Sequence, residues 1–415
     1  MLKETSARGH LLAVLQYGKT LLKWLLVSAA VGLLVGAAGS AFSHTLSWVN
    51  RIRAAHPWLL LTLPVGGLVI VFLYHVLKNT EDKGTNTVMA AVHGETDVSW
   101  KTAPLIFVST VITHLCGGSA GREGAALQLG GSIASQLGRL LRLKDGDRRI
   151  IVMCGMSAGF SALFGTPMAA AVFSLEVAFV GVMHYTALLP CVTASLTASF
   201  VAGFFQVPPE VFPVAGLPAI SPLGFLKIVA LSVAVGGVSV VFCMLLHRAE
   251  HLYRRYLNHP YLRIAVGGGL VVLLSVLLQT DLYLGSGMGI IEEIFHEGTT
   301  KPLAFLLKMV FTALTLGAGF KGGEIVPSFT VGAALGCVAA PLLGLPVDLA
   351  AACGMAGLFC GVTNAPLTSL LISFELFGYE GMPYYLAAVA VSYLMSGHHS
   401  LYHAQQILHS KLSID

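Results

Sequence analysis

The chain has 415 residues, and its composition is unlike that of a soluble protein. Hydrophobic residues make up 55% of the chain and charged residues only 11%, whereas soluble globular chains carry about 25% charged residues. The formal net charge of +4 fits loops that face anionic lipid headgroups, so it requires no nucleic-acid partner. The composition indicates a membrane protein.

Apolar segments follow one another along most of the chain. A bilayer core is about 30 Å thick, and apolar segments long enough to cross it lie at 22–45, 58–78, 183–205, 224–246 and 262–279. Shorter segments, separated by Gly and Pro, lie at 103–116, 124–137, 150–164, 166–180, 303–316, 325–340, 350–362 and 366–377. These predict half-length or tilted helices, because irregular backbone at membrane depth must be covered by protein or line a water-filled cavity. We therefore expect an all-α polytopic membrane protein.

The first long apolar segment follows a basic N-terminal region. It continues past the length of a signal peptide without a clear cleavage site, so we expect it to anchor the chain in the membrane. The basic residues before it favour a cytoplasmic N-terminus: Lys3, Arg8, Lys19 and Lys23. We expect an integral protein of the bacterial inner membrane.

Cysteine and histidine give no sign of a metal site or of another cofactor. The seven cysteines stand singly in apolar segments without a CxxC pair, which is typical of small buried side chains. The fifteen histidines are dispersed, and no HExxH spacing occurs.

Two parts of the chain repeat one pattern. Residues 154–167 read CGMSAGFSALFGTP and residues 353–366 read CGMAGLFCGVTNAP, in one register because 353 − 154 = 199 and 366 − 167 = 199. Residues 207–222 contain five prolines, which interrupt helices. We divide the chain into transmembrane repeat one at 1–206, a Pro-rich linker at 207–222 and transmembrane repeat two at 223–415. Internal duplication with broken helices is typical of transporters and channels that bind their substrate between the repeats.

A glycine-rich turn precedes an apolar run in each half. Residues 117–131 read GGSAGREGAALQLGG, and their counterpart at 317–336 reads GAGFKGGEIVPSFTVGAALG, with Glu123 and Glu324 at the two joins. The first turn of a helix has unpaired N–H groups and partial positive charge, so two such turns aimed at one point predict a site for a small anion. A carboxylate at Glu123 can occupy that place and leave it on protonation. In the alternative interpretation, Arg122 and Glu123 form a compensated ion pair or cap the helix.

The motifs resemble those of the CLC family of chloride channels and proton/halide antiporters, of prokaryotic type. GREG at 121–124 with the following LQLGG, the run GG..VP.F at 322–329, GTP with a later FSLE, and SLYHAQQIL near the end occur in the family's order. The resemblance implies two inverted repeats of short, tilted and broken helices. It also implies a homodimer in membrane lipid, in which each subunit has its own pore for chloride or fluoride and for protons.

The resemblance also implies roles for individual residues. Glu123 matches the gating glutamate, which transfers protons, and Tyr402 matches the tyrosine that closes the inner side of the pore, although a tyrosine near a last span is more often an interfacial anchor. GTNTV at 84–88 matches the first anion-binding loop. The expected anion-binding residues are Thr85, Asn86, Gly121, Arg122, Gly124, Gly323, Glu324, Ile325, Val326 and Tyr402.

Several positions depart from the chloride-type pattern. The first loop lacks the Gly and Pro of Gly-Ser-Gly-x-Pro, and Ala125 stands where a Pro usually follows GREG. Glu324, together with Asn86 in the first loop, is more similar to the fluoride-exporting branch, but Thr85 and Val326 do not reproduce that branch. The transported halide is therefore left open between chloride and fluoride.

Two further glutamates occupy equivalent positions in the two repeats. Glu176 and Glu375 suit a structural role, such as pairing with an Arg or Lys of a loop. The inner proton-relay glutamate of the chloride antiporters aligns with Val177, so proton entry is expected to use Glu123 alone with water, or coupling is lost.

The remaining alternatives concern the class of activity. GMSAG at 155–159 matches the G-x-S-x-G motif of hydrolases, but it lies in an apolar run and Ala356 replaces Ser157 in the duplicate, so we expect no enzyme. Between a proton-coupled antiporter and a passive voltage- or pH-gated chloride channel, we favour the antiporter, because a gating glutamate can bind protons and only thirteen residues follow Tyr402.

Overall fold

The computed structural model describes residues 7–214 and 216–411, with side chains from Ala13 onward. Lys3 and the side chain of Arg8, which were among the basic groups that favoured a cytoplasmic N-terminus, lie outside the described part. The described residues form sixteen α-helices and only two strands of two residues each, so the prediction of an all-α protein is confirmed.

The helices of the second half follow the order of those of the first half, and apart from the first pair, of 49 and 35 residues, their lengths are similar. The first half contains α1 (Ala7–Ala55), α2 (Leu63–Val76), α3 (Thr85–His93), α4 (Thr102–Leu115), α5 (Glu123–Leu140), α6 (Asp145–Phe164), α7 (Pro167–Glu176) and α8 (Leu188–Phe204). The second contains α9 (Pro222–Tyr256), α10 (Pro260–Leu278), α11 (Met288–Glu297), α12 (Ala304–Ala318), α13 (Ile325–Leu343), α14 (Val347–Thr363), α15 (Pro366–Phe377) and α16 (Met382–Met395). The short 3-10 helices η1 (Pro57–Thr62) and η2 (Tyr185–Ala187) and the parallel strands β1 (Phe179–Val180) and β2 (Gln406–Ile407) complete the described elements.

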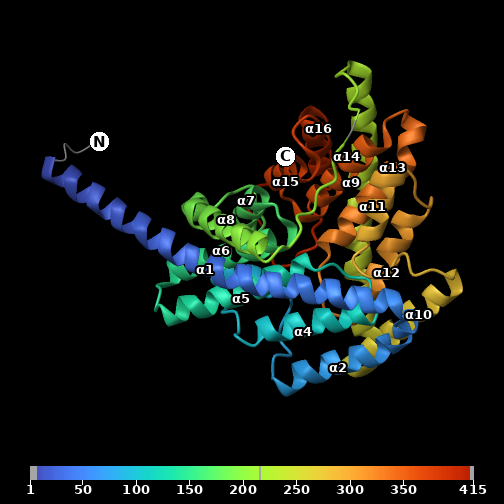
Figure 1. The fold of residues 1–415 in the computed structure, drawn as a ribbon, viewed down its shortest axis with the longest axis horizontal. Coiled ribbons are helices and arrows are strands. Elements are labelled where there is room, and N and C mark those ends of the chain that lie inside the picture. The colour runs from blue at the N-terminus through green and yellow to red at the C-terminus, as the bar shows by residue number, and fades with distance from the viewer. Residues whose placement is uncertain (1–6, 215, 412–415) are drawn as a thin grey trace.

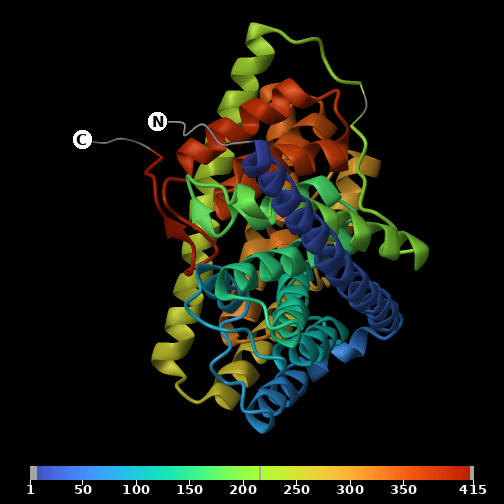
Figure 2. The ribbon, with the colours of Figure 1, turned by 90° about the vertical axis from the view of Figure 1, so that its left-hand side faces the viewer.

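In the described part of the chain, six helical segments are long and apolar enough to cross a membrane: Ala13–Ala55, Pro57–Val76, Tyr185–Phe204, Pro222–Tyr256, Pro260–Leu278 and Ile325–Leu343. In Figure 1 the long helix α1 runs across the molecule, and its N-terminal end projects beyond the other helices. α2 and α10 pack together at one end, and the red C-terminal helices lie toward the other end in both views (Figures 1 and 2).

Three of the segments expected to be half-length or tilted helices are not half-length in the structure. The runs at 124–137, 150–164 and 325–340 belong to helices of 18, 20 and 19 residues. Hydropathy marks only the apolar part of a helix, and α6 begins with the polar turn Asp145–Asp147. For the same reason the sequence analysis missed the short helices α3 and α11, which carry polar residues in their turns, and it also missed α16.

Glycine lets two pairs of helices cross in the same way in the two halves. α5 packs on α6 where Gly130 faces Gly155, and α13 packs on α14 where Gly332 faces Gly354. A Cβ atom at any of these positions would overlap a backbone carbonyl of the opposite helix. The backbones can therefore approach closely only because these residues have no side chain.

Glu176 and Glu375 join the two halves by capping each other's helices. The Glu375 carboxylate at the end of α15 accepts hydrogen bonds of 2.9 Å from the amides of Met168 and Ala169 at the start of α7. Glu176 at the end of α7 accepts from the start of α15, at 3.0 Å from the Leu367 amide and 2.9 Å from the Thr368 amide. The expected partner, an Arg or Lys of a loop, was wrong, because the positive ends of these two helices take that place.

The proline-rich region connects α8, which ends at Phe204, to α9. Four of its prolines lie outside helices. The fifth, Pro222, was assigned to the linker but is the first residue of α9, where Ser221 Oγ accepts from the Gly224 amide at 3.0 Å. Proline is tolerated there because the first helical residue needs no intrahelical N–H bond.

Removal of the exchanged carboxylates tests their structural role. We expect Glu176→Ala to lower the free energy of unfolding by about 2 kcal/mol, because two amides and the Thr368 hydroxyl lose their acceptor in a buried interface. The measurement is the apparent melting temperature in detergent. The matched control is Glu380→Ala at an exposed position. Equal melting temperatures for the two variants would contradict the assignment.

Candidate functional site

The site is built around a contact between two glycine-rich turns. The Gly121 amide donates to the Gly323 carbonyl at 2.7 Å, and the Gly323 amide donates to the Gly121 carbonyl at 2.8 Å. α5 begins two residues after Gly121, and α13 begins two residues after Gly323. The two bonds therefore bring the N-terminal ends of α5 and α13 together in the interior.

A third helix begins at the same place. Thr85, the first residue of α3, is buried, and Gln128 of α5 donates from Nε2 to Thr85 Oγ1 at 3.4 Å and to the Gly124 carbonyl at 3.1 Å. A Cβ atom at Gly124 would lie 3.2 Å from Thr85 Oγ1 and 3.3 Å from Glu324 Oε2. Three helix N-termini thus surround Gly124, and their unpaired N–H groups concentrate partial positive charge there.

Glu123 fills the start of α5 with its own carboxylate. It is the first residue of that helix and is fully buried. Its Oε2 accepts from the Arg122 amide at 3.1 Å, while its Oε1 has no hydrogen-bond partner among the described residues and lies 3.5 Å from Arg122 Nε. The carboxylate therefore occupies a position at a helix N-terminus that suits a small anion.

Arg122 is shared between two carboxylates. Its Nη2 lies 2.5 Å from Glu210 Oε1, which is closer than its contact with Glu123. The Arg122–Glu123 pair of the alternative interpretation is thus present, but Arg122 forms its shorter ion pair with Glu210 of the linker.

Glu324 brings a second carboxyl group into the same region. It precedes the first residue of α13, and its Oε2 is buried without a hydrogen-bond partner in the described part of the chain. Ile325 and Val326 follow in the first turn of α13 and are fully buried. Their backbone N–H groups belong to the unpaired first turn, whereas their side chains are aliphatic.

Tyr402 of the last loop lies in the same region as Glu123 and Glu324. Its side chain is 3% exposed, and its hydroxyl group has no hydrogen-bond partner among residues 7–214 and 216–411. The Ala404 amide donates to Asn86 Oδ1 at 2.9 Å, which ties this loop to α3. A buried phenol without an acceptor is a donor available to an anion.

Not every residue on the predicted list is free to bind an anion. The amides of Gly121 and Gly323 are used in their mutual bridge, and Asn86 Oδ1 accepts from the loop of Tyr402. These three residues hold the site together. Among the described residues, the buried side-chain atoms of this site that have no hydrogen-bond partner are Glu123 Oε1, Glu324 Oε2 and the Tyr402 hydroxyl oxygen.

Val177 stands at the position that aligns with the proton-relay glutamate of the chloride antiporters, so its side chain supplies no carboxylate there. Val177 is fully buried, and its carbonyl accepts from Gln405 Nε2 at 2.7 Å. The same Nε2 atom also donates to the Thr363 carbonyl at 2.7 Å. The neighbouring Glu176 points to α15, as described above, so it does not replace the missing acid.

The sequence analysis missed Lys308, a fully buried lysine in α12. Its Nζ donates to Ser119 Oγ at 2.9 Å, to the Tyr283 carbonyl at 3.1 Å and to the Gly285 carbonyl at 2.7 Å. Gly285 in turn pairs through its backbone with the turn before Gly121. The available signal was a single lysine in an apolar run, since ionisable residues at membrane depth are functional candidates.

A cluster of three titratable side chains beside Tyr402 was also not predicted from the sequence: His247, Glu250 and His403. The rings of His247 and His403 stack with centroids 4.0 Å apart, and His403 Nε2 lies 4.0 Å from Glu250 Oε2. His247 and Glu250 are one turn apart in α9, but their proximity to His403 depends on the fold of the last loop.

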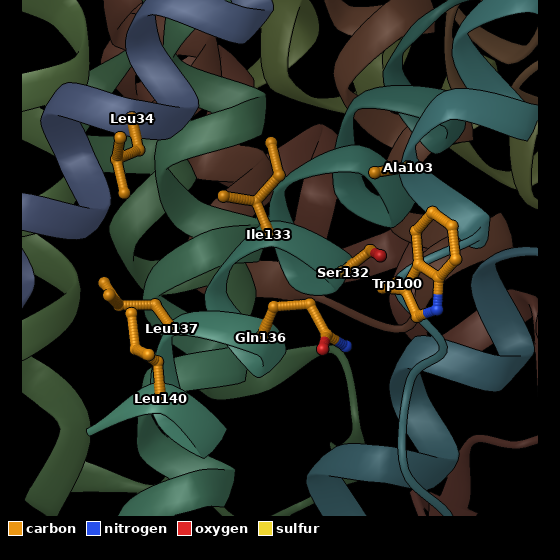
Figure 3. A pocket seen from close by; sticks show the side chains of 8 residues that line it. All are labelled: Leu34, Trp100, Ala103, Ser132, Ile133, Gln136, Leu137 and Leu140. Carbon is orange, nitrogen blue, oxygen red and sulfur yellow. The ribbon is translucent and has the colours of Figure 1, made fainter. Parts of the chain in front are cut away.

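A surface hollow elsewhere in the molecule is lined by none of the candidate site residues. A hollow of about 450 Å³ lies between α1, α4 and α5 and is lined mainly by apolar side chains (Figure 3). Its polar side chains, Ser132 and Gln136, donate to the carbonyls of Ser99 and Val98. They are therefore satisfied within the protein.

Ser157 of the GMSAG sequence lies inside α6. It is fully buried, and its hydroxyl group donates to the Cys191 carbonyl at 3.0 Å. The G-x-S-x-G motif indicates a nucleophile only on a strand-to-helix turn. Here the serine joins α6 to α8, and the seven cysteines are all buried and free, as expected.

Comparison with known proteins gives consistent matches over nearly the whole chain. The family model "Voltage gated chloride channel" matches residues 66–397. A "Chloride/fluoride channel protein" from Pseudomonas syringae pv. tomato is 38% identical over 397 residues, which cover 94% of this chain and 87% of the relative. An "H(+)/Cl(-) exchange transporter ClcA" from Salmonella typhi is 25% identical over 398 residues, covering 89% and 84%.

Solved structures give the same result. The crystal structure of a CLC-type fluoride/proton antiporter matches with a TM-score of 0.91 and 35% identity, over 93% of this chain and 98% of that one. A slow cyanobacterial Cl⁻/H⁺ antiporter matches with a TM-score of 0.78 at 19% identity, over 90% and 94%, which supports the fold alone. The chain is an integral membrane protein and belongs to the voltage gated chloride channel, or CLC, family.

Proposed function

We propose that the protein exchanges halide anions for protons across the membrane, with Glu123 as both gate and proton carrier. The observation that carries the proposal is the position of the Glu123 carboxylate, fully buried at the meeting point of three helix N-termini. A halide and this carboxylate compete for the same N–H groups, because both are negatively charged hydrogen-bond acceptors.

The exchange follows from that competition. Ionised Glu123 is attracted to the start of α5 and excludes the anion. A protonated Glu123 loses this attraction, so it leaves the place to an anion and carries one proton. Release of the proton restores the carboxylate, which displaces the anion, so that anion and proton occupy the site in linked steps.

A passive chloride channel is the second candidate, and the relatives support both classes. The Pseudomonas syringae relative is named a channel, whereas the structural neighbour at 35% identity is an antiporter. We favour the antiporter because three ionisable groups, Glu123, Glu324 and Tyr402, lie at the site and can take part in proton transfer.

We further propose that fluoride is preferred to chloride. Glu324 adds a carboxyl group whose Oε2 is buried and unpaired in the described structure, and a protonated carboxyl group is a strong donor to a small, basic anion. Two relatives at 38% and 35% identity carry fluoride in their names.

The proposal extends to the internal repeats, the oligomeric state and the orientation of the chain in the membrane. We propose that residues 1–206 and 223–415 act as inverted repeats, that two copies form a homodimer, and that the N-terminus faces the cytoplasm of a bacterium. Lys23, paired with Asp147 at 2.5 Å, lies with Lys19 near the cytoplasmic end of α1 in this orientation. Bacterial relatives support an inner-membrane location.

The first test follows proton and anion movement together in liposomes. For the wild type we expect an anion gradient to drive protons uphill. For Glu123→Gln we expect proton movement to fall by a factor of about 100, because the amide cannot carry a proton, while anion flux continues. Uphill proton movement that is unchanged in the variant would exclude Glu123 as the carrier. Anion flux without proton movement in the wild type would indicate a channel.

The second test concerns the choice of halide. We expect Glu324→Gln to lower the ratio of fluoride to chloride flux about tenfold, since the amide cannot be protonated to donate in the same way. Ser157→Ala is the control, because its hydroxyl only joins α6 to α8, and we expect unchanged fluxes. A flux ratio that is the same in Glu324→Gln and in the control would contradict the role of Glu324.

A further inference from the structure

Glu210 of the linker lies beside the site, and it competes with Glu123 for the guanidinium group of Arg122. Its Oε1 is 2.5 Å from Arg122 Nη2, whereas the Glu123 Oε1 atom is 3.5 Å from Arg122 Nε. The side chains of Arg122 and Glu210 are 16% and 20% exposed, and that of Glu123 is 0% exposed. Arg122 therefore connects a partly exposed carboxylate with the fully buried carboxylate of Glu123.

The linker holds Glu210 in place through its backbone. The Glu210 amide donates to the Phe164 carbonyl at the end of α6 at 3.1 Å, and the Phe212 amide donates to the Leu376 carbonyl of α15 at 2.7 Å. The linker is thus fastened to α6 at Glu210 itself and to α15 two residues later. Its carboxylate is preorganised for Arg122 and does not depend on a mobile loop.

We propose that Glu210 is a positioning residue that sets how firmly Arg122 retains the ionised Glu123 gate. The inference rests on the proposed function. In the ion pair with Glu210, the guanidinium charge is drawn away from Glu123, and the negative charge of Glu210 itself opposes a second ionised carboxylate nearby. Both effects favour protonation and release of the gate.

Other charged groups surround this arrangement. On the outer side, the ionisable groups electrostatically coupled to Arg122 or Glu210 are His114 of α4 and Glu292 of α11. Tyr402 is coupled to both Glu123 and Glu324 on the inner side. Of the residues that the structure describes, Glu210 alone forms an ion pair with Arg122 apart from Glu123 itself.

Loss of the Glu210 charge is expected to lower the pH at which Glu123 becomes protonated. Without the Glu210 charge, Arg122 is available to Glu123 and stabilises its ionised form. The gate then requires a lower pH to become protonated, so exchange at a given pH becomes slower. Restoring a carboxylate at position 210 restores the competition.

The experiment measures halide/proton exchange in liposomes with the same pH on both sides, over a range of pH values and with fluoride and chloride in turn. For Glu210→Gln we expect the pH of half-maximal exchange to fall by about 0.5 unit or more. We expect Glu210→Asp to shift it less. Glu297→Gln removes an exposed carboxylate of α11 outside this cluster and is expected to leave the profile unchanged.

A double variant shows whether Glu210 acts through the gate. In a Glu123→Gln background, the Glu210→Gln change should not move the pH profile of anion flux. An unshifted profile for Glu210→Gln, a shift equal to that of Glu297→Gln, or a changed anion affinity without a pH shift would each overturn the inference. If the wild type carries anions without protons, the proposed function fails, but the pH dependence of anion flux still tests Glu210.

Discussion

Two backbone hydrogen bonds between Gly121 and Gly323 are the constraint on which the rest of the site depends. They fix the starts of α5 and α13 side by side in the membrane interior, where unpaired N–H groups of helix ends are costly unless an acceptor is present. Glu123 supplies that acceptor from within the chain. The same electrostatic need that holds its carboxylate in place also makes the place attractive to a small anion, so the proposed gate and the proposed binding site arise from one arrangement.

The duplication explains how a single chain builds such a meeting point. Each half supplies a glycine turn followed by a helix, and each half ends a short helix with a glutamate that caps its counterpart, Glu176 on α15 and Glu375 on α7. The capping pairs hold the two halves together at a distance from the gate, while the glycine bridge holds them at the gate. Glu176 and Glu375 thus have a structural role, whereas Glu123 and Glu324 each keep an oxygen without a partner among the described residues, which supports the functional role that we propose for them.

Local sequence patterns predicted the helical class, the glycine turns and Glu123, because apolar run length, glycine and an isolated acid act through nearby residues. They did not predict what depends on distant parts of the chain. The ion pair of Arg122 with Glu210 spans 88 positions, and the capping of α15 by Glu176 spans 191. The amide of Gly121 looked available for an anion, but its partner in the other half takes it. Lys308 was visible as a lysine in an apolar run, yet only the fold shows that its acceptors lie in the turn behind Gly121.

We propose that Glu123 and the transported anion compete for the same helix ends, so binding of the anion must depend on the protonation of Glu123. Calorimetric titration of the detergent-solubilised protein with fluoride, and separately with chloride, in buffers of different ionisation enthalpy measures this dependence directly. The account predicts proton uptake on anion binding in the wild type, and binding without proton uptake in Glu123→Gln. Anion binding that takes up no proton in the wild type, or the same proton uptake in both proteins, would contradict it.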